Sequence, residues 1–400
     1  MIRPTVLRSM AEARCELERI GADPAGIVRM LPKLEMLPIL VPKLRAAAAN
    51  ILKQELLSLG GDAAVARGTV SCSIETTDVL LIATRKQLQE LCDKLAQQPF
   101  GLAALAEQLG ELLATLTRPL SPWKLADREL TLQRPLIMGI LNVTPDSFSD
   151  GGRFTTVEAA LEHALQMADQ GADIIDIGAE STRPGAPLIT PQEELRRLLP
   201  VVERLAGRLS IPISIDTWKA PVADATLASG AEIINDISGL TFDPHLAEVT
   251  AQHRAGLVLM HTRGTPATMQ HDTGYDDLMG DIADFLQTSI RTALDAGNRR
   301  EQLVLDPGIG FGKDVSGNLE IVRRLGELAG FGLPLLVGSS RKGFIGTVLG
   351  REKPQDRLFG TAATVALAVA QGAHILRVHD VQAMRDVADM VHRILSPTDF

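Results

Sequence analysis

The chain of 400 residues carries a formal net charge of −9 at pH 7, with 45% hydrophobic and 22% charged residues. This acidic balance argues against a surface built mainly to bind nucleic acid, and no apolar run reaches the roughly 18 residues of a membrane span. The three cysteines show no metal-ligand spacing, and their odd number predicts free thiols rather than a disulfide framework or a zinc site. The amino terminus lacks the apolar segment of a signal peptide. We therefore expect a cytoplasmic protein without nucleic-acid or membrane partners.

Residues 1–130 are expected to form a separate small α/β domain. Apolar periodicity and glycine stops predict its helices at 11–20, 46–59, 85–98 and 102–116, and short strands at 70–74 and 79–83. Its charged residues form no recognisable catalytic cluster, so its role stays open between docking and oligomerisation. The proline-containing stretch 118–134 is typical of a linker.

The remainder, residues 131–400, shows short apolar runs that alternate with helical patterns. The runs lie at 136–141, 174–178, 213–215, 233–237, 257–260, 303–305, 334–338 and 375–378. Eight β/α units within about 265 residues predict a (β/α)8 TIM barrel over about 135–400, with a doubly wound open sheet as the alternative. In both architectures ligands bind at the loops that follow the carboxyl ends of the strands.

The first of these strands is followed by a polar loop that contains Asn142, Asp146 and Asp150. Amide and carboxylate oxygens there suit a metal-bound anion. The stretch Met138-Gly-Ile-Leu-Asn-Val-Thr-Pro-Asp-Ser-Phe-Ser-Asp-Gly-Gly resembles the signature of the dihydropteroate synthases, the folate-pathway enzymes that sulfonamides block. The resemblance covers residues 135–396 without a gap at the motifs.

Polar residues at the ends of other strands fit a pterin pocket. Two carboxylates and an amide, Asp216, Asn235 and Asp306, complement the donors and acceptors of a 2-amino-pyrimidinone edge. A buried aspartate without a partner would be costly, so a ligand or a strong internal partner is expected. In the resembled family these positions form the pterin pocket, with Met260 as a packing surface and Lys342 bound to ring heteroatoms.

The resemblance assigns a second loop, with Thr182, Arg183 and Pro184, to the diphosphate and p-aminobenzoate. It also implies that Phe311 lines the p-aminobenzoate site. Residues 306–313, DPGIGFGK, contain the glycines of a phosphate-binding loop. That motif needs another glycine and a serine or threonine where Pro307 and Asp314 stand, so we expect only a tight strand-to-helix loop.

The last strand carries Arg377 and His379, whose spacing of two places both side chains on one face. With Asn142 and a metal ion they could hold a diphosphate. Two further residues, Arg341 and His261, are expected to be structural.

The resemblance implies condensation of 7,8-dihydropterin-6-ylmethyl diphosphate with p-aminobenzoate by a homodimer, with Mg²⁺ as cofactor and Asn142 as its ligand. The expected catalytic residues are Asp216, Arg183, Lys342, Arg377 and His379. Because an arylamine is a weak nucleophile, a dissociative, SN1-like departure of diphosphate is expected. Two alternatives stay open: a pterin-dependent methyltransferase domain, and a non-catalytic pterin-binding homologue.

Overall fold

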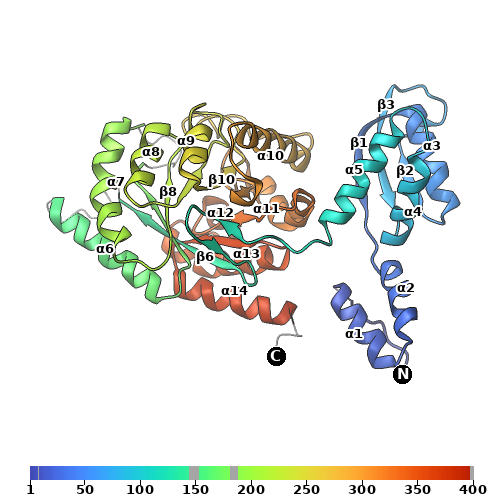
Figure 1. Ribbon diagram of the computed structural model, residues 1–400, viewed down its shortest axis with the longest axis horizontal. Helices are drawn as coiled ribbons and strands as arrows, with labels where there is room; N and C mark the ends of the chain where they lie inside the picture. The colour runs from blue at the N-terminus through green and yellow to red at the C-terminus, as the bar shows by residue number, and fades with distance from the viewer. Residues whose placement is uncertain (8, 144–152, 181–187, 397–400) are drawn as a thin grey trace. The chain divides into compact units, whose positions relative to one another are not determined.

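The computed structural model describes residues 1–7, 9–143, 153–180 and 188–396. The chain divides into two compact units, Met1–Arg118 and Pro119–Phe400 (Figure 1). The second unit begins earlier than residue 131, where the sequence placed the boundary. The reason is that the residues just after Arg118 pack as part of the barrel rather than as a linker.

The first unit contains a helical hairpin and a small three-stranded sheet. The hairpin consists of α1 (Met10–Ile20) and α2 (Pro24–Leu34). The sheet has the antiparallel order β1-β3-β2 and is formed by β1 (Ile39–Arg45), β2 (Asp62–Val65) and β3 (Thr76–Ile82). Three helices contribute to the same apolar core: α3 (Ala46–Ser58), α4 (Arg85–Leu95) and α5 (Leu102–Thr115).

The predicted helices of this unit are all present, but the strand expected at 70–74 is wrong. The chain forms a 3-10 turn at Arg67–Thr69, and Val70 lies 76% exposed. The amide of Asn50 donates to the carbonyl oxygen of Thr69 at 2.8 Å, and Ser73 N–H donates to the Gly68 carbonyl oxygen at 3.1 Å. These bonds fold the segment back on itself, which overrides the strand preference of its β-branched residues.

The second unit is a (β/α)8 barrel. Its strands are β6 (Leu136–Asn142), β7 (Ile174–Gly178), β8 (Ile213–Asp216), β9 (Ile233–Asp236), β10 (Gly256–Met260), β11 (Leu303–Asp306), β12 (Leu336–Val337) and β13 (Ile375–Val378). Its helices are α6 (Arg153–Asp169), α7 (Pro191–Ala206), α8 (Ala220–Ala228), α9 (Leu246–His253), α10 (Leu278–Asp295), α11 (Val315–Arg324), α12 (Gly343–Leu349), α13 (Leu358–Ala370) and α14 (Val381–Leu395). Figure 1 shows these helices arranged around the strands.

The eight strands are parallel and close on themselves. Their order is β11-β10-β9-β8-β7-β6-β13-β12, and a parallel bridge between Leu305 and Leu335 joins the two ends. The backbone N–H of Leu305 also donates to the carbonyl oxygen of Pro334 at 2.9 Å. The closed sheet confirms the barrel and excludes the doubly wound open sheet. No helix in the described ranges has the length and apolar character needed to cross a membrane.

A short hairpin covers the amino-terminal end of the barrel. It consists of β4 (Trp123–Lys124) and β5 (Glu129–Leu130). The fully buried Trp123 packs with Leu125 and the first apolar residues of the barrel strands, and its Nε1–H donates to the carbonyl oxygen of Gln302 at 2.8 Å. The prediction that 118–134 is simply a linker is therefore wrong for this hairpin.

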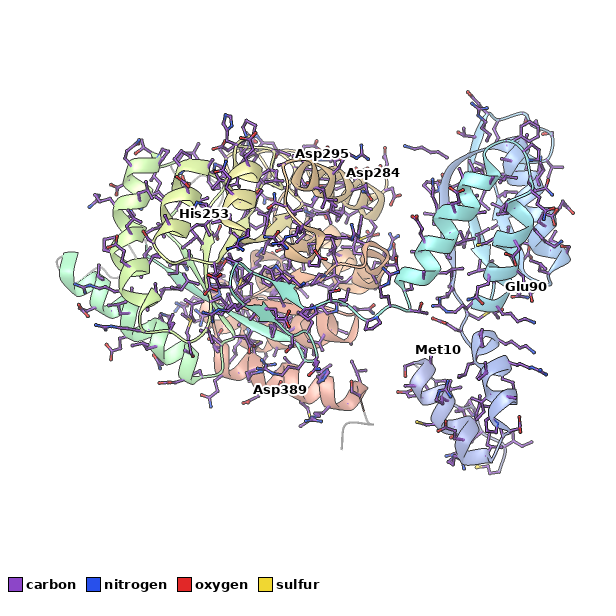
Figure 2. All side chains as sticks on the ribbon, in the orientation of Figure 1. Met10, Glu90, His253, Asp284, Asp295 and Asp389 are labelled. Atoms are coloured by element: carbon purple, nitrogen blue, oxygen red, sulfur yellow. The ribbon has the colours of Figure 1, made fainter. Side chains whose placement is uncertain are left out.

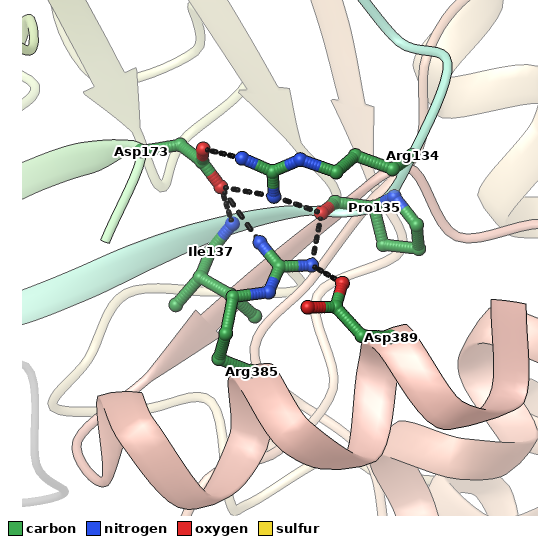
Figure 3. Close-up of polar contacts among 6 residues, drawn as sticks. All are labelled: Arg134, Pro135, Ile137, Asp173, Arg385 and Asp389. Carbon is green, nitrogen blue, oxygen red and sulfur yellow. Dashed lines mark hydrogen bonds and ion pairs between the residues drawn. The ribbon is translucent and has the colours of Figure 1, made fainter. Parts of the chain in front are cut away.

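An ion-pair network at the same end joins the first and last parts of the barrel (Figure 3). The carboxylate of Asp173, just before β7, accepts from Arg134 at 2.6 Å and from Arg385 of α14 at 2.9 Å. It also accepts from the backbone N–H of Ile137 at 2.8 Å, and Arg385 donates in turn to Asp389 at 2.7 Å. These contacts lie opposite the strands' carboxyl ends, so they belong to stability rather than to chemistry.

Candidate active site

The carboxyl ends of the strands open into a cavity of about 1290 Å³. The sequence-predicted site residues that line it are Asn142, Asp216, Phe311, Lys342, Arg377 and His379. Three others, Asn235, Met260 and Asp306, are buried at the ends of β9, β10 and β11. Thr182, Arg183, Pro184, Asp146 and Asp150 lie outside the described residues.

The centre of the site is Arg377 on β13, which lies between two carboxylates. Its Nε donates to Asp176 Oδ2 at 2.6 Å, and one Nη donates to Asp216 Oδ2 at 2.7 Å. Asp176, on β7, is fully buried and also accepts from Ser214 Oγ at 2.6 Å and from the Asn235 amide at 3.2 Å. One buried carboxylate thus links Arg377 to Asn235, two residues that the sequence assigned to different substrate groups.

Sequence reasoning missed Asp176. The signal was present, because this aspartate is the only charged residue in the otherwise apolar run 174–178. A charge inside a barrel strand is costly unless it is paired and hydrogen-bonded. Its three side-chain partners meet that requirement.

Asp216 is the most perturbed acid of the cavity wall. Burial raises its pKa to about 7, against the opposing effect of Arg377 and with a further upward contribution from Asp176. Its Oδ1 is buried and makes no hydrogen bond with the described residues. One oxygen of the carboxyl group is therefore bound by Arg377, and the other has no hydrogen-bond partner among the described residues.

A second polar group gathers where β11 and β12 end. Burial raises the pKa of Asp306, and the nearby Lys342 opposes that rise. The pKa of Lys342 is lowered to about 8, chiefly by burial. Its Nζ donates to the carbonyl oxygen of Ile309 and lies 4.5 Å from the centroid of the Phe311 ring. The Lys342 ammonium, with a pKa only slightly above neutral pH, therefore lies over the Phe311 ring.

The remaining cavity groups lie at the ends of β6 and β13. His379 is oriented by Ser340, whose Oγ lies 3.0 Å from Nδ1 and accepts the backbone N–H of His379 at 3.2 Å. Asn142 is exposed at the end of β6. A Cβ built on Gly178 would lie 3.8 Å from Asn142 Oδ1 and 3.7 Å from Asp216 Oδ2, so these two side chains flank the same glycine.

The donor set suits a metal ion that is shared with a substrate. Within the described ranges, no group of three or more His, Cys, Asp or Glu residues could hold a metal on its own. Mg²⁺ commonly keeps several waters and takes one or two protein oxygens together with substrate phosphates. The exposed amide oxygen of Asn142 fits that mode.

A partly buried lysine joins the described residues on either side of 181–187. Lys219 Nζ donates to Glu180 at 2.7 Å, to Glu194 of α7 at 2.6 Å and to the carbonyl oxygen of Ile189 at 2.9 Å. Glu180 also accepts the backbone N–H of Ile189 at 2.7 Å. The two described ends of the segment that carries Arg183 are thereby held together. Lys219 was not identified from the sequence, because nothing local distinguishes it from a surface lysine.

The residues expected to be structural have structural contacts. Arg341 forms a two-point ion pair with Asp380, at 3.0 and 2.5 Å. His261 is buried, with Nδ1 2.8 Å from Lys313 Nζ. His253, to which the sequence assigned no role, lies at the end of α9 and contacts Asp224 at 2.8 Å (Figure 2).

Comparison with known proteins agrees with this geometry. The family model described as "Pterin binding enzyme" matches residues 138–379. The dihydropteroate synthase of Synechocystis is 50% identical over 255 residues, which cover 64% of this chain and 88% of that protein. A solved structure of the Xanthomonas albilineans dihydropteroate synthase with 4-aminobenzoic acid has 45% identity and a TM-score of 0.65, covering 69% of this chain and 99% of that one.

The amino-terminal unit also has a counterpart. A probable bifunctional folylpolyglutamate synthase/dihydropteroate synthase of Halobacterium salinarum is 40% identical over 380 residues. That match covers 94% of this chain but 45% of the archaeal protein. With the closed barrel, the clustered strand-end residues and these matches together, the chain belongs to the pterin-binding enzyme family, among the dihydropteroate synthases, which are transferases.

Proposed function

We propose that the barrel unit condenses 7,8-dihydropterin-6-ylmethyl diphosphate with p-aminobenzoate, giving 7,8-dihydropteroate and diphosphate. The observation that carries this proposal is Asp216 Oδ1, a buried carboxylate oxygen without a hydrogen-bond partner among the described residues. A buried acceptor left unpaired costs free energy. The N–H groups of a bound pterin edge would pair with it.

The pterin would lie over the network centred on Arg377. Asp216, Asn235 and Asp306 supply the acceptors and the amide, and Lys342 donates to a ring heteroatom. Met260, 3% exposed at the end of β10, would support the apolar face of the ring. The pKa of Asp216 near 7 allows this group to accept as a carboxylate at slightly alkaline pH and to donate as an acid below it.

The diphosphate would lie at the mouth, close to Asn142, Arg377 and His379, with Arg183 as a further cation. The neighbouring carboxylates hold the pKa of Arg377 above its ordinary value, against the effect of burial, so it remains a cation at every working pH. Ser340 holds the ring of His379. Fixed positive groups of this kind stabilise charge on a leaving group.

Mg²⁺ would be held by the Asn142 amide oxygen together with oxygens of the diphosphate. When bound, the ion would neutralise negative charge on the leaving group.

p-Aminobenzoate would pack against Phe311, with Thr182 and Pro184 completing its site. The Lys342 ammonium above the Phe311 ring supports this placement, because the carboxylate-bearing aryl group would meet an apolar wall with a cation close by. Sulfonamides, which resemble p-aminobenzoate, are expected to compete for the same place.

The arylamine is a weak nucleophile, so we propose that the C–O bond to diphosphate breaks first. The electron pair leaves with the diphosphate, and the dihydropterin delocalises the positive charge. Asp216 in its ionised form would stabilise that cation at the ring. The C–N bond then forms and the amine loses a proton.

A cytoplasmic homodimer is proposed as the working form. Exposed apolar side chains on α13 and α14 support a self-association surface: Phe359 is 85%, Leu367 55%, Met390 64% and Ile394 60% exposed. Light scattering of the wild type and of the double variant Phe359→Glu/Met390→Glu tests this. A dimer that becomes a monomer agrees with the proposal, and an unchanged mass in the variant contradicts it.

The activity is tested by measuring diphosphate release from the dihydropterin diphosphate with Mg²⁺. Formation of 7,8-dihydropteroate should require p-aminobenzoate and should fall when a sulfonamide is added. Binding of the pterin without formation of 7,8-dihydropteroate when p-aminobenzoate is present would refute the synthase activity and favour a methyltransferase or a non-catalytic pterin-binding protein.

A further inference from the structure

The loop between β11 and α11 surrounds a buried ammonium group to which no role has been assigned. Lys313 is 3% exposed, and its Nζ lies 2.8 Å from His261 Nδ1 and 2.9 Å from the carbonyl oxygens of both Gly308 and Phe311. An ammonium group has three N–H donors. The protonated amine can donate to all three of these partners, although burial, opposed by Asp306, lowers the pKa of Lys313 well below its ordinary value.

The glycines of the loop make this arrangement possible. Gly308, Gly310 and Gly312 have φ of +71°, +84° and +64°, the left-handed region that glycine adopts readily. A Cβ on Gly308 would lie 1.9 Å from the carbonyl oxygen of His261, so the close approach of the two backbones requires glycine there.

The backbone of this loop is oriented in the opposite way to that of a phosphate-binding loop. A phosphate-binding loop turns backbone N–H groups toward an anion. Here two carbonyl oxygens accept from the buried amine nitrogen of Lys313, and the Gly310 N–H donates to the Asn318 side chain at 2.5 Å. The glycine-rich stretch 306–313, which lacks the residues of a phosphate-binding loop, instead surrounds the side chain of Lys313.

The same loop carries two groups of the cavity wall. Its Ile309 carbonyl oxygen accepts from Lys342 Nζ, and the Phe311 ring lies 4.5 Å from that Nζ. The position of Lys342 above Phe311 consequently depends on the path of the loop backbone. That path is set by the carbonyl contacts to Lys313.

We propose that Lys313 is a positioning residue that fixes the β11–α11 loop and, through it, holds Phe311 and Lys342 in place for p-aminobenzoate and the pterin. This role rests on the proposed synthase activity. The Nζ of Lys313 is occupied by contacts to His261, Gly308 and Phe311, so its proposed effect on the substrates is indirect. Burial lowers the pKa of both members of the Lys313–His261 pair, to about 2 for His261 and well below its ordinary value for Lys313, so the two carbonyl contacts of Lys313 are what hold the loop.

The test is Lys313→Ala with chemical rescue by n-propylammonium, which replaces the atoms that the substitution removes. We expect kcat/KM for p-aminobenzoate to fall about 100-fold, the size of effect that a misplacement of about 1 Å produces. Hydrogen exchange should accelerate at residues 308–312 and stay unchanged in β7 to β9. Propylammonium should restore both the rate and the protection, whereas uncharged 1-propanol should restore neither.

Lys353→Ala, at an exposed lysine, is the matched control and should respond to neither compound. Lys313→Met keeps the side-chain volume and serves if the alanine variant does not fold. Wild-type kinetics and wild-type loop protection in either variant would overturn the proposal. The exchange measurement needs no substrate, so a wild type without synthase activity would refute the proposed function while the loop role is still decided.

Discussion

Asp216→Asn should stabilise the barrel at alkaline pH while it weakens catalysis. The pKa of Asp216 rises from an ordinary 3.8 to about 7, mainly because the carboxyl group is buried. Asparagine has the shape of the protonated acid but never ionises. Arg377 keeps its 2.6 Å bond to Asp176 in the variant, so the substitution does not leave a buried cation without a partner.

The pH dependence of the stability difference between variant and wild type follows from proton binding at residue 216. Between pH 4 and 7 the folded wild type binds more protons at this site than the unfolded chain does, so its free energy of unfolding falls as the pH rises. A shift of about 3 pKa units corresponds to about 4 kcal/mol. The variant should therefore exceed the wild type in stability by up to about 4 kcal/mol above pH 7, and the difference should vanish near pH 4.

Urea unfolding of the barrel unit between pH 4.5 and 8.5 measures this difference. Asp284→Asn, at an exposed position on α10 (Figure 2), is the matched control and should show no such pH dependence. The kcat/KM of Asp216→Asn should fall, because the variant cannot place a carboxylate beside the pterin. The reasoning would be refuted if the variant were no more stable than the wild type at pH 8, or if the gap did not shrink toward acid.

Two further predictions concern the end of the barrel opposite the cavity. Arg385→Met should lower the free energy of unfolding by about 3 kcal/mol, since it strips a buried partner from the carboxylate network of Figure 3; thermal unfolding measures this, and an effect no larger than that of exposed Asp386→Asn would contradict it. A chain that begins at Pro119 should keep wild-type kcat, whereas one that begins at residue 126 lacks Trp123 and should be about 3–5 kcal/mol less stable. Equal stability of the two truncated chains in urea would show that the hairpin does not support the barrel.

The barrel could be predicted from the sequence because its strands are short apolar runs at regular spacing, buried on both faces. The first unit was harder. Val70–Ile74 has strand-forming residues, but hydrogen bonds from Asn50 and within the turn decide its conformation. The hairpin at Trp123 cannot be told from a linker by pattern, because two-residue strands leave no periodic signal.

The candidate site likewise contains residues that could be predicted from the sequence and residues that could not. Asp216, Lys342 and Arg377 lie at or just after strand ends, where ligands bind in a (β/α)8 barrel, and all three line the cavity. Asp176 and Lys313 act from inside a strand and inside a loop. Their importance depends on partners 201 residues away in the sequence for Asp176 and 52 residues away for Lys313, and local pattern does not reveal such pairs.

The most direct test of the central claim is the ratio of the two products. Purified chain, supplied with the dihydropterin diphosphate, Mg²⁺ and p-aminobenzoate, should form 7,8-dihydropteroate and diphosphate in equal amounts, with the first followed by chromatography and the second by an independent assay. Diphosphate formed without dihydropteroate, or no turnover by a folded protein that binds the pterin, would contradict the account.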